Sequence, residues 1–215
     1  MDENPFTIGF NNGVYDIKED VFHPRWKVPK EYVISMTVRY DYVPPDAPGA
    51  SDIMQTIENE VYAKIFPDPN TREQIKAFAG SLLVSGNQSK KLFLMLGERG
   101  DNGKSSYVNW FMNDTLGDYC STIPIQVVTE RKEASDGCTP QLAANRKRKL
   151  VCLNEGDRRA KLNSGTTKTL TGNDNISVRN LYGQPEAVKF HPKLCYVSNY
   201  APAIDATDEA LARRM

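Results

Sequence analysis

An apolar run that leads into a glycine loop and then into a helix is the strongest constraint on how this chain folds. The stretch "KLFLMLGERGDNGKSSYVNW" (91–110) combines a buried-strand pattern, three glycines and the triplet Gly103-Lys104-Ser105. Glycine N–H groups can approach phosphate oxygens closely, and the N-terminus of a helix carries partial positive charge. The stretch therefore predicts a phosphate-binding loop between a buried strand and a helix over 104–112.

The loop does not follow the usual spelling G-x-x-x-x-G-K-[ST], because the position five residues before Gly103 holds Glu98. The alternative is a glycine-rich turn with a solvated lysine, but the flanking strand and helix favour nucleotide binding. In that interpretation Lys104 reaches the β- and γ-phosphates of ATP, and Ser105 helps to hold Mg²⁺. The candidate cofactor-binding residues span the loop and the first helical turn: Gly97, Gly100, Asp101, Asn102, Gly103, Lys104, Ser105 and Ser106.

Two later apolar runs each end in a polar residue suited to catalysis. Glu155 follows the run 150–153, and Asn199 ends the run 193–199. A carboxylate at the end of a neighbouring strand can hold hydrated Mg²⁺ or orient the attacking water. Asn199 suits the place between the γ-phosphate and that water. A loop carboxylate and a turn-forming asparagine are the alternatives, but their order after the glycine loop favours the catalytic interpretation.

The central and C-terminal parts alternate between apolar runs and helical patterns. Strands are predicted over 148–154 and 193–199, with a helix near 162–170 between them. Strands that alternate with helices predict a mostly parallel sheet with helices on both faces. The expected fold class is α/β.

The N-terminal part predicts short strands over 5–43, with a hairpin turn at Asn11-Asn12-Gly13. A proline-rich linker over 43–50 precedes a helix for which Ser51 is the candidate N-cap. A second helix is predicted from Thr71 to Leu83, opened by a capping box of Thr71 and Gln74. The sequence therefore predicts that the whole chain divides into three parts. These are a β-rich segment with linker over 1–50, a helical segment over 51–87, and an ATPase core over 88–215.

Composition narrows the classes of function. The chain has 215 residues and a formal net charge of zero, so a broad duplex-binding face is not expected and any nucleic-acid contact must be local. No apolar run is long enough to cross a bilayer, and the acidic start lacks a signal-peptide layout. The four cysteines are scattered without a C-x-x-C pair, which fits a reducing, intracellular location without a zinc cluster or disulfide framework. The two histidines, His23 and His191, both precede prolines and are expected at the surface or in loops.

The order of these motifs resembles that of the superfamily 3 helicases. More closely, the chain is similar to the poxvirus-type helicase–primase ATPases of large DNA viruses, with their phage and plasmid relatives. The most specific stretch is "LTGNDNISVRNLYGQPEAVKFHPKLCYVSNYAPAIDATDEALARRM" (170–215). The segments "IGFNNGVYDI", "EYVISMTVRYDY" and "GERGDNGKSSYVNW" also match, so the resemblance covers nearly the whole chain.

The resemblance implies an AAA+-like ATPase core that assembles into a hexameric ring and pulls single-stranded DNA through its centre. It implies that Glu155 is the catalytic carboxylate, that Asn199 is the sensor, and that ATP and Mg²⁺ are the cofactors. Arg213 or Arg214, with Arg213 preferred, would complete the site of the neighbouring subunit. The segment 172–182 would be a DNA-contacting hairpin with Arg179 on it and Tyr182 near its base; for Tyr182, core packing is preferred over base stacking.

Three features depart from the family pattern. The glycine loop is one residue longer than usual, and Asn175 stands where relatives often carry a lysine. Relatives also continue past the arginine pair and often carry a primase domain upstream, so we expect a fragment of a longer viral or phage replication protein. The alternative function is a non-catalytic nucleotide-binding or assembly module. The basic run over 145–149 is interpreted as a solvated helix end or a subunit-interface cluster rather than a nucleic-acid patch.

Overall fold

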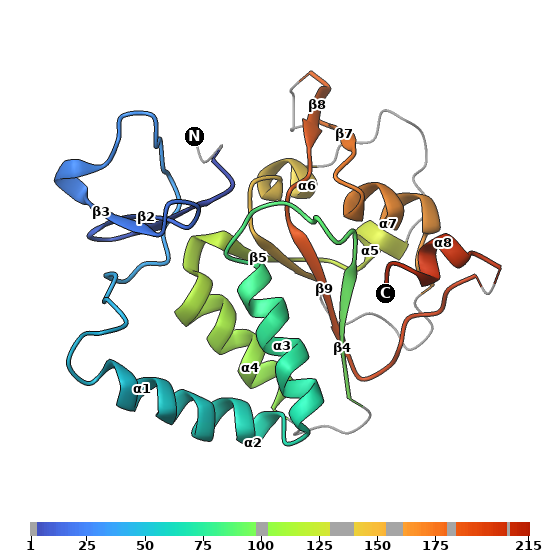
Figure 1. Ribbon diagram of the computed structural model, residues 1–215. Helices are drawn as coiled ribbons and strands as arrows, with labels where there is room; N and C mark the ends of the chain where they lie inside the picture. Colours follow the sequence, from blue (N-terminus) through green and yellow to red (C-terminus); the bar gives the residue numbers. More distant parts are fainter. Residues whose placement is uncertain (1–3, 98–102, 130–139, 154–160, 180–183, 206) are drawn as a thin grey trace. The chain divides into compact units, whose positions relative to one another are not determined.

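The computed structural model describes residues 4–97, 103–129, 140–153, 161–179, 184–205 and 207–215 (Figure 1). The chain divides into two compact units. One comprises Met1–Val84 with Asp101–Asp118, and the other comprises Ser85–Gly100 with Tyr119–Met215. The domain boundaries expected from the sequence stay a prediction, and the two units are described one at a time.

The first unit opens with a three-stranded antiparallel sheet. Its strands are β1 (Thr7–Phe10), β2 (Gly13–Asp16) and β3 (Val21–Pro24), followed by a 3₁₀ turn, η1 (Arg25–Lys27). Phe10 pairs with Gly13, which confirms the predicted hairpin. The expectation of strands as far as residue 43 is wrong, since residues 28–43 hold no strand. Side-chain bonds hold part of this segment instead: the Asn12 amide bonds the N–H and C=O of Tyr42 at 2.9 and 3.1 Å.

The helix after the linker is continuous but changes type. It runs through α1 (Ala50–Thr56), a π-helical stretch η2 (Ile57–Tyr62) and α2 (Ala63–Ile65). Its N-cap is Gly49 rather than the predicted Ser51. Gly49 takes a left-handed φ of 81°, which suits glycine, and the chain enters the helix two residues earlier than expected.

The next helix, α3 (Pro69–Ser81), also starts earlier than predicted. Its N-cap is Asp68, whose carboxylate accepts a 2.7 Å hydrogen bond from the Thr71 N–H. Pro69 occupies the first turn, where its missing N–H costs nothing. The predicted capping box of Thr71 and Gln74 is therefore wrong. Thr71 lies inside the helix, and Asp68 caps the helix by accepting from the Thr71 N–H.

The N-terminal segment also bonds to the chain that follows the glycine loop, within the same unit. Helix α4 (Lys104–Trp110) passes into a π-helical stretch η3 (Phe111–Leu116) and a 3₁₀ turn η4 (Gly117–Tyr119). Asp118 donates its N–H to the Thr37 carbonyl at 2.9 Å and pairs with the Arg39 guanidinium at 2.7 Å. Gly117 has a φ of 52°, and a Cβ there would lie 2.8 Å from backbone atoms of Thr37 and Val38.

Replacing Gly117 with alanine is therefore expected to destabilise the first unit. The positive φ alone costs about 1–3 kcal/mol for a residue with a side chain, and the neighbouring backbone cannot move aside as a side chain could. The matched control is Gly80→Ala in α3, where a Cβ has nothing within 4 Å. That control is expected to gain about 0.4–1 kcal/mol. Urea unfolding of both variants tests this, and equal unfolding free energies would contradict it.

The second unit is built on a four-stranded parallel sheet, ordered β4-β9-β6-β5. The strands are β4 (Leu92–Leu96), β5 (Cys120–Ile123), β6 (Leu150–Leu153) and β9 (Lys193–Ser198). The sheet confirms the predicted parallel architecture and the three predicted strands, while β5 was not anticipated. The protein is thus mixed α/β, with a parallel sheet here and an antiparallel sheet in the first unit.

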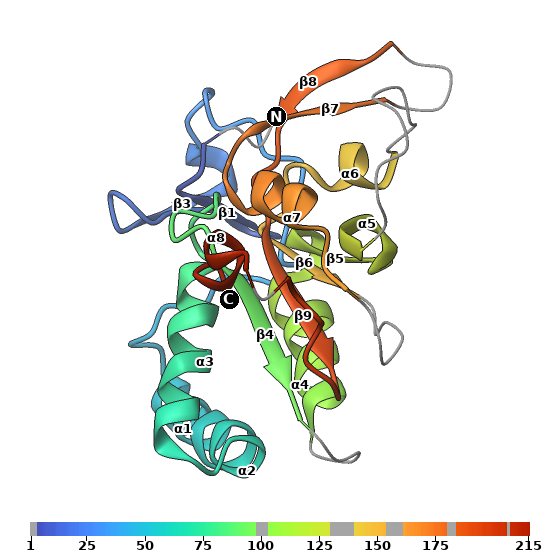
Figure 2. The same cartoon turned by 90° about the vertical axis from the view of Figure 1, so that its right-hand side faces the viewer.

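Short helices and a hairpin complete this unit. The helices are α5 (Gln126–Thr129), α6 (Pro140–Asn145), α7 (Ser164–Thr171) and α8 (Glu209–Ala212). The hairpin strands β7 (Asn175–Val178) and β8 (Glu186–Lys189) pair antiparallel and extend beyond the amino end of the parallel sheet (Figure 2). None of the helices in the described ranges is both long and apolar enough to cross a membrane.

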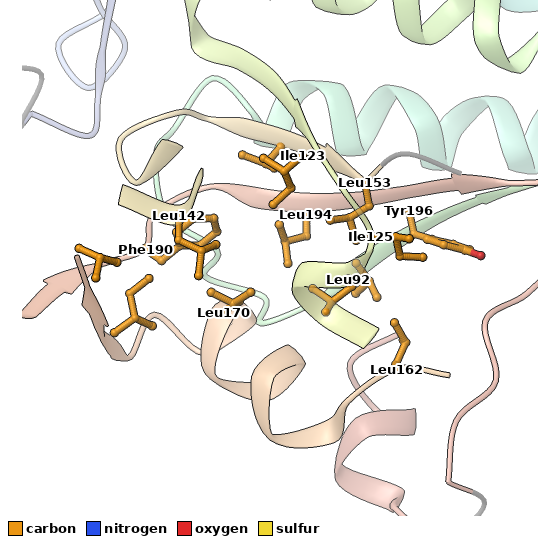
Figure 3. Close-up of a cluster of buried hydrophobic side chains, with 14 of the residues drawn as sticks. Leu92, Ile123, Ile125, Leu142, Leu153, Leu162, Leu170, Phe190, Leu194 and Tyr196 are labelled. Carbon is orange, nitrogen blue, oxygen red and sulfur yellow. The ribbon is translucent and has the colours of Figure 1, made fainter. Parts of the chain in front are cut away.

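One face of the parallel sheet, the helices and the hairpin share a hydrophobic core (Figure 3). Val151 and Leu194 are register partners on this face, as are Leu153 and Tyr196. The core also includes side chains from α5, α6, α7 and α8, from the hairpin strands and from residues next to these elements: Ile125, Val128, Leu142, Ala143, Leu162, Leu170, Ile176, Val178, Val188, Phe190 and Leu211.

Three cysteines that are far apart in the sequence lie side by side in the sheet. Cys152 and Cys195 are register partners in β6 and β9, and Cys120 lies in the neighbouring strand β5, where its register partner is Leu150. Hydrogen bonding to Cys152 and burial raise the pKa of the Cys195 thiol, which keeps it protonated. Cys138 lies outside the described residues. Across the described parts of the chain, no His, Cys, Asp and Glu side chains gather into a group that could hold a metal ion.

Candidate nucleotide site

The candidate site begins at the carboxyl edge of the parallel sheet. Leu96 of β4 is level with Ser198 of β9, so Gly97 and Asn199 follow at the same edge. Strand β6 ends at Leu153, level with Tyr196 of β9, and Glu155 lies outside the described residues. Strand β9 therefore separates β4 from β6, so the strand before Glu155 is not the direct neighbour of β4 as the sequence interpretation assumed.

The helical half of the loop lies in the first unit. Gly103 is the N-cap of α4 with a left-handed φ of 77°, and a Cβ there would lie 3.2 Å from the Ile65 side chain. Lys104 is buried, whereas Ser105 and Ser106 are exposed. Gly100, Asp101 and Asn102 lie outside the described residues.

The start of α4 has the features of an anion-binding helix end. Within the described residues no side chain caps it, and its first turn contains no acidic residue. Uncapped N–H groups and the helix dipole favour a negatively charged ligand at such a place. The helical stretch continues to Leu116, long enough for its dipole to develop.

An aromatic cluster fixes α4 within its unit. The Tyr107 ring lies 5.0 Å from Phe66 edge-on and 5.6 Å from Phe111 in a stacked arrangement, measured between centroids. Tyr62 packs edge-on against both Tyr107 and Trp110. Aromatic pairs in these geometries add about 0.5–1.5 kcal/mol beyond the burial of their surface. The residues that follow Gly103 are thus presented on a rigid helix.

The two C-terminal arginines have different surroundings. The Arg214 guanidinium donates to the Lys168 carbonyl at 3.0 Å and to the Thr171 hydroxyl at 2.9 Å, at the end of α7. The Arg213 side chain is 80% exposed and pairs at 3.0 Å with Glu209, which is also exposed. Arg214 is therefore part of the packing of α7 and α8, while Arg213 points to the surface.

Asp208 joins the same two helices and was missed by the sequence interpretation. Its carboxylate caps α8 through the Leu211 N–H at 2.9 Å and contacts Lys168 at 2.8 Å and the Ser164 hydroxyl in α7. These bonds, led by that from Lys168, lower the pKa of Asp208 from 3.8 to about 2. An aspartate just before a helical pattern is a capping signal, but its contacts with α7 depend on the tertiary fold.

The depressed pKa of Asp208 predicts an acid-sensitive contribution to stability. A carboxyl whose pKa falls on folding stabilises the fold fully above its unfolded pKa, and this contribution is lost as the pH falls through the folded pKa. We expect the unfolding midpoint in urea to be higher for the wild type than for Asp208→Asn at pH 5. The two should converge between about pH 4 and about pH 2, given the pKa values of 3.8 and about 2. The exposed Asp46→Asn serves as control, and a pH-independent difference for Asp208→Asn would contradict the prediction.

One of the two predicted nucleic-acid residues lies beside the hairpin. Arg179 is exposed and directly follows β7, whereas Tyr182 lies outside the described residues. The predicted hairpin segment 172–182 contained only the first of its two strands; the second is Glu186–Lys189. The short sequence "EAVK" between turn residues gives little strand signal by itself.

Comparison with known proteins places the chain among viral replication proteins. A family model described as "D5 N terminal like" matches residues 1–63. The chain is 32% identical over its whole length to "Putative helicase L207/L206" of Acanthamoeba polyphaga mimivirus, covering 22% of that protein. It is also 24% identical to "Primase D5" of Fowlpox virus (strain NVSL), again over its whole length and covering 27% of that protein.

The chain belongs to the poxvirus-type helicase–primase family of large DNA viruses. "Putative helicase 184R" of Invertebrate iridescent virus 6 is a further relative, 30% identical over the whole chain, which covers 22% of it. The chain thus spans about a fifth of the length of these helicase–primase relatives. A solved structure of the NrS-1 C-terminal region shares the fold, with a TM-score of 0.51 and 14% identity over 72% of this chain and 35% of that one.

Proposed function

We propose that this chain is part of the ATP-driven motor of a DNA helicase that acts in viral replication, with an AAA+-like P-loop core. The observation that supports this most is the common carboxyl edge of β4, β9 and β6 in one parallel sheet. In open α/β sheets, ligands bind outside the carboxyl ends of the strands. The glycine loop follows β4, the segment with Glu155 follows β6, and Asn199 follows β9, so all three come after strands that end at this edge.

Each candidate residue has a role in this proposal. Lys104 would bind the β- and γ-phosphates, with Ser105 on Mg²⁺ and the loop amides on the phosphate oxygens. Asn199 would orient water beside the γ-phosphate, and Glu155 would supply the catalytic carboxylate. ATP and Mg²⁺ are the cofactors that this set of donors suits, because a lysine, a hydroxyl and a carboxylate complement phosphates and a hard cation.

A ring of subunits is the second part of the proposal. Arg213 and Arg214 lie beside the amino end of β4, since the Leu92 N–H donates to the Arg214 carbonyl at 2.6 Å. Gly97 follows the opposite end of the same strand, and Arg213 has an exposed side chain. In a head-to-tail ring, different surfaces of two subunits meet. An arginine at the amino edge of one subunit's sheet can therefore reach the nucleotide site at the carboxyl edge of its neighbour's sheet. We propose that this ring translocates single-stranded DNA.

The helicase and primase names of the relatives support this function and a primase domain in the same polypeptide. They also support activity at a site of viral replication inside the host cell. The test measures ATP turnover by the full-length protein with and without single-stranded DNA. A motor is expected to hydrolyse ATP faster with DNA. ATP binding without turnover would instead identify a non-catalytic nucleotide-binding or assembly module.

A further inference from the structure

Three cysteines share the face of the parallel sheet that lies opposite the hydrophobic core. The side chains of Val151 and Leu194 belong to the core on one face. Because side chains alternate along a strand, the next residues, Cys152 and Cys195, lie on the other face. Cys120 of β5 is level with the residue two before Cys152, so it lies on this face as well. Three of the chain's four cysteines thus lie on one face of three neighbouring strands.

Cys152 and Cys195 are spaced as a disulfide requires. They are free thiols and register partners in adjacent parallel strands, and such strands lie about 4.7–4.9 Å apart. Disulfides join cysteines whose Cα atoms are about 4.4–6.8 Å apart. Cys120 is out of register with Cys152 by two residues, which puts its Cα atom about 8 Å away at about 3.3 Å per residue. Among these three cysteines, Cys152 and Cys195 are therefore the pair that can close.

Cys152 is the thiol of this group that is best suited to attack an oxidant. The neighbouring thiols of Cys120 and Cys195 lower the pKa of Cys152, because each can donate to its thiolate. The thiolate, rather than the thiol, is the nucleophile. Cys195 has a raised pKa and stays a thiol. An attacking thiolate therefore lies beside a second thiol that can complete a disulfide.

The edge strand β5 gives a small oxidant access to this face. Cys120 is only partly buried, and Thr122, the register partner of Cys152, is exposed. Cys152 and Cys195 themselves are only 4% and 2% exposed. Bulky oxidants such as a peptide disulfide are therefore excluded, whereas hydrogen peroxide is a small neutral molecule.

We propose that Cys152 and Cys195 form a reversible disulfide when the protein meets hydrogen peroxide, and that this bond slows the ATP-driven motor. The Cys152 thiolate attacks one peroxide oxygen, the O–O bond breaks, and hydroxide leaves a sulfenic acid on Cys152. The Cys195 sulfur then attacks the Cys152 sulfur, the S–O bond breaks, and the departing hydroxide takes the Cys195 proton to form water. The two sulfur atoms together lose two electrons, which reduce one peroxide to water and hydroxide. Disulfides inside cells are usually transient and redox-sensing, which suits this role.

The bond joins the two strands that lead to the candidate catalytic segments. Strand β6 precedes the segment with Glu155, and β9 precedes Asn199. A disulfide holds its Cβ atoms about 3.8 Å apart, whereas neighbouring strands lie about 4.8 Å apart. Oxidation therefore draws β6 and β9 together near the carboxyl edge, and a misplacement of about 1 Å can lower a rate about 10²-fold. This effect on rate rests on the proposed motor function.

The test maps the disulfide in the full-length protein. The protein is treated with hydrogen peroxide, its remaining thiols are blocked with iodoacetamide, and it is digested with trypsin without a reductant. Mass spectrometry should find peptide 150–158 joined to peptide 194–213, and dithiothreitol should separate them. ATP turnover of the same samples should fall about 10²-fold on oxidation and return with dithiothreitol.

Two variants assign the bond to its cysteines. Cys195→Ala should lose both the joined peptides and the response of turnover to peroxide. Cys120→Ala is the matched control, because Cys120 lies on the same face but outside the bond, and it should keep both.

Three outcomes overturn the proposal. Oxidised wild-type protein without the joined peptides excludes the disulfide, whatever its turnover. Joined peptides with unchanged turnover exclude control of the motor by this bond. A peroxide response that persists in Cys195→Ala excludes this pair as its cause. Absent turnover before oxidation instead overturns the motor itself, and the peptide map then decides whether the bond forms.

Discussion

Lys104→Ala is expected to abolish ATP hydrolysis. The lysine follows Gly103 at the start of α4, where the described first turn offers no other cation to the β- and γ-phosphates. Removing one neutral donor to a developing charge costs about 10²–10³ in rate, and removing a full positive charge is expected to cost more. Steady-state ATP turnover of the full-length protein measures the effect.

The matched control is Lys64→Ala in α2. Lys64 belongs to the same unit, is exposed, and pairs with Glu60 one helical turn away. The control should turn over ATP at the wild-type rate and keep the wild-type unfolding midpoint, because Lys64 is exposed. Undiminished turnover in Lys104→Ala would exclude the glycine loop as the phosphate-binding site.

The strands that the sequence predicted best are those buried in the parallel sheet. The runs over 92–96, 150–153 and 193–198 are apolar almost throughout, which is typical of strands covered on both faces. Strand β5 escaped prediction because "CSTI" forms an edge of the sheet and three of its four residues are only partly buried or exposed. Short helices such as α5 and α6 give too few turns for a periodic signal.

Local signals were less reliable where tertiary contacts decide the structure. Ser51 and Thr71 are both good N-cap residues, but the chain enters each helix earlier, at Gly49 and at Asp68. The order β4-β9-β6-β5 could not be read from chain order, because β9 inserts between two earlier strands. The same insertion brings Cys195 beside Cys152.

The residues of the candidate site stay predictions from motif order and family resemblance, whereas their arrangement depends on the fold. Motif order pointed to Lys104, Asn199 and the arginine pair, and the register places Asn199 level with Gly97. The sequence already ranked Arg213 before Arg214, but their different surroundings could not be read from it, since adjacent arginines have equal chemistry in a sequence. The pairing of Asn175 with Lys189 likewise depends on the register of β7 and β8, which the sequence alone does not show.

Arg213→Ala is expected to lower ATP turnover by about 10³–10⁵, the range found when an arginine finger is removed. Arginine suits this role because it stays charged and presents a planar fork of donors to the transferred phosphoryl group. Arg213 can leave its exposed partner Glu209 at little cost, since exposed ion pairs contribute about 0–1 kcal/mol. Arg214 cannot leave α7 without breaking its bonds to Lys168 and Thr171.

The Arg213→Ala and Arg214→Ala variants are expected to differ in their unfolding midpoints as well as in their rates of ATP turnover. Arg214→Ala should lower the unfolding midpoint, because it leaves the Thr171 hydroxyl and the Lys168 carbonyl without their donor. Arg213→Ala should unfold as the wild type does, while its turnover falls. A loss of turnover in Arg214→Ala at an unchanged unfolding midpoint, with Arg213→Ala fully active, would assign the finger to Arg214 instead.

Mixing experiments test whether Arg213 acts on the neighbouring subunit. Full-length Arg213→Ala subunits are combined with Lys104→Ala subunits, each inactive alone. In a head-to-tail ring, an interface between one subunit with intact Lys104 and a neighbour with intact Arg213 has a complete site. Partial turnover should therefore return on mixing and depend on the ratio of the two variants. If Arg213 acts within its own subunit, the mixture stays inactive at every ratio, because no subunit then carries both residues.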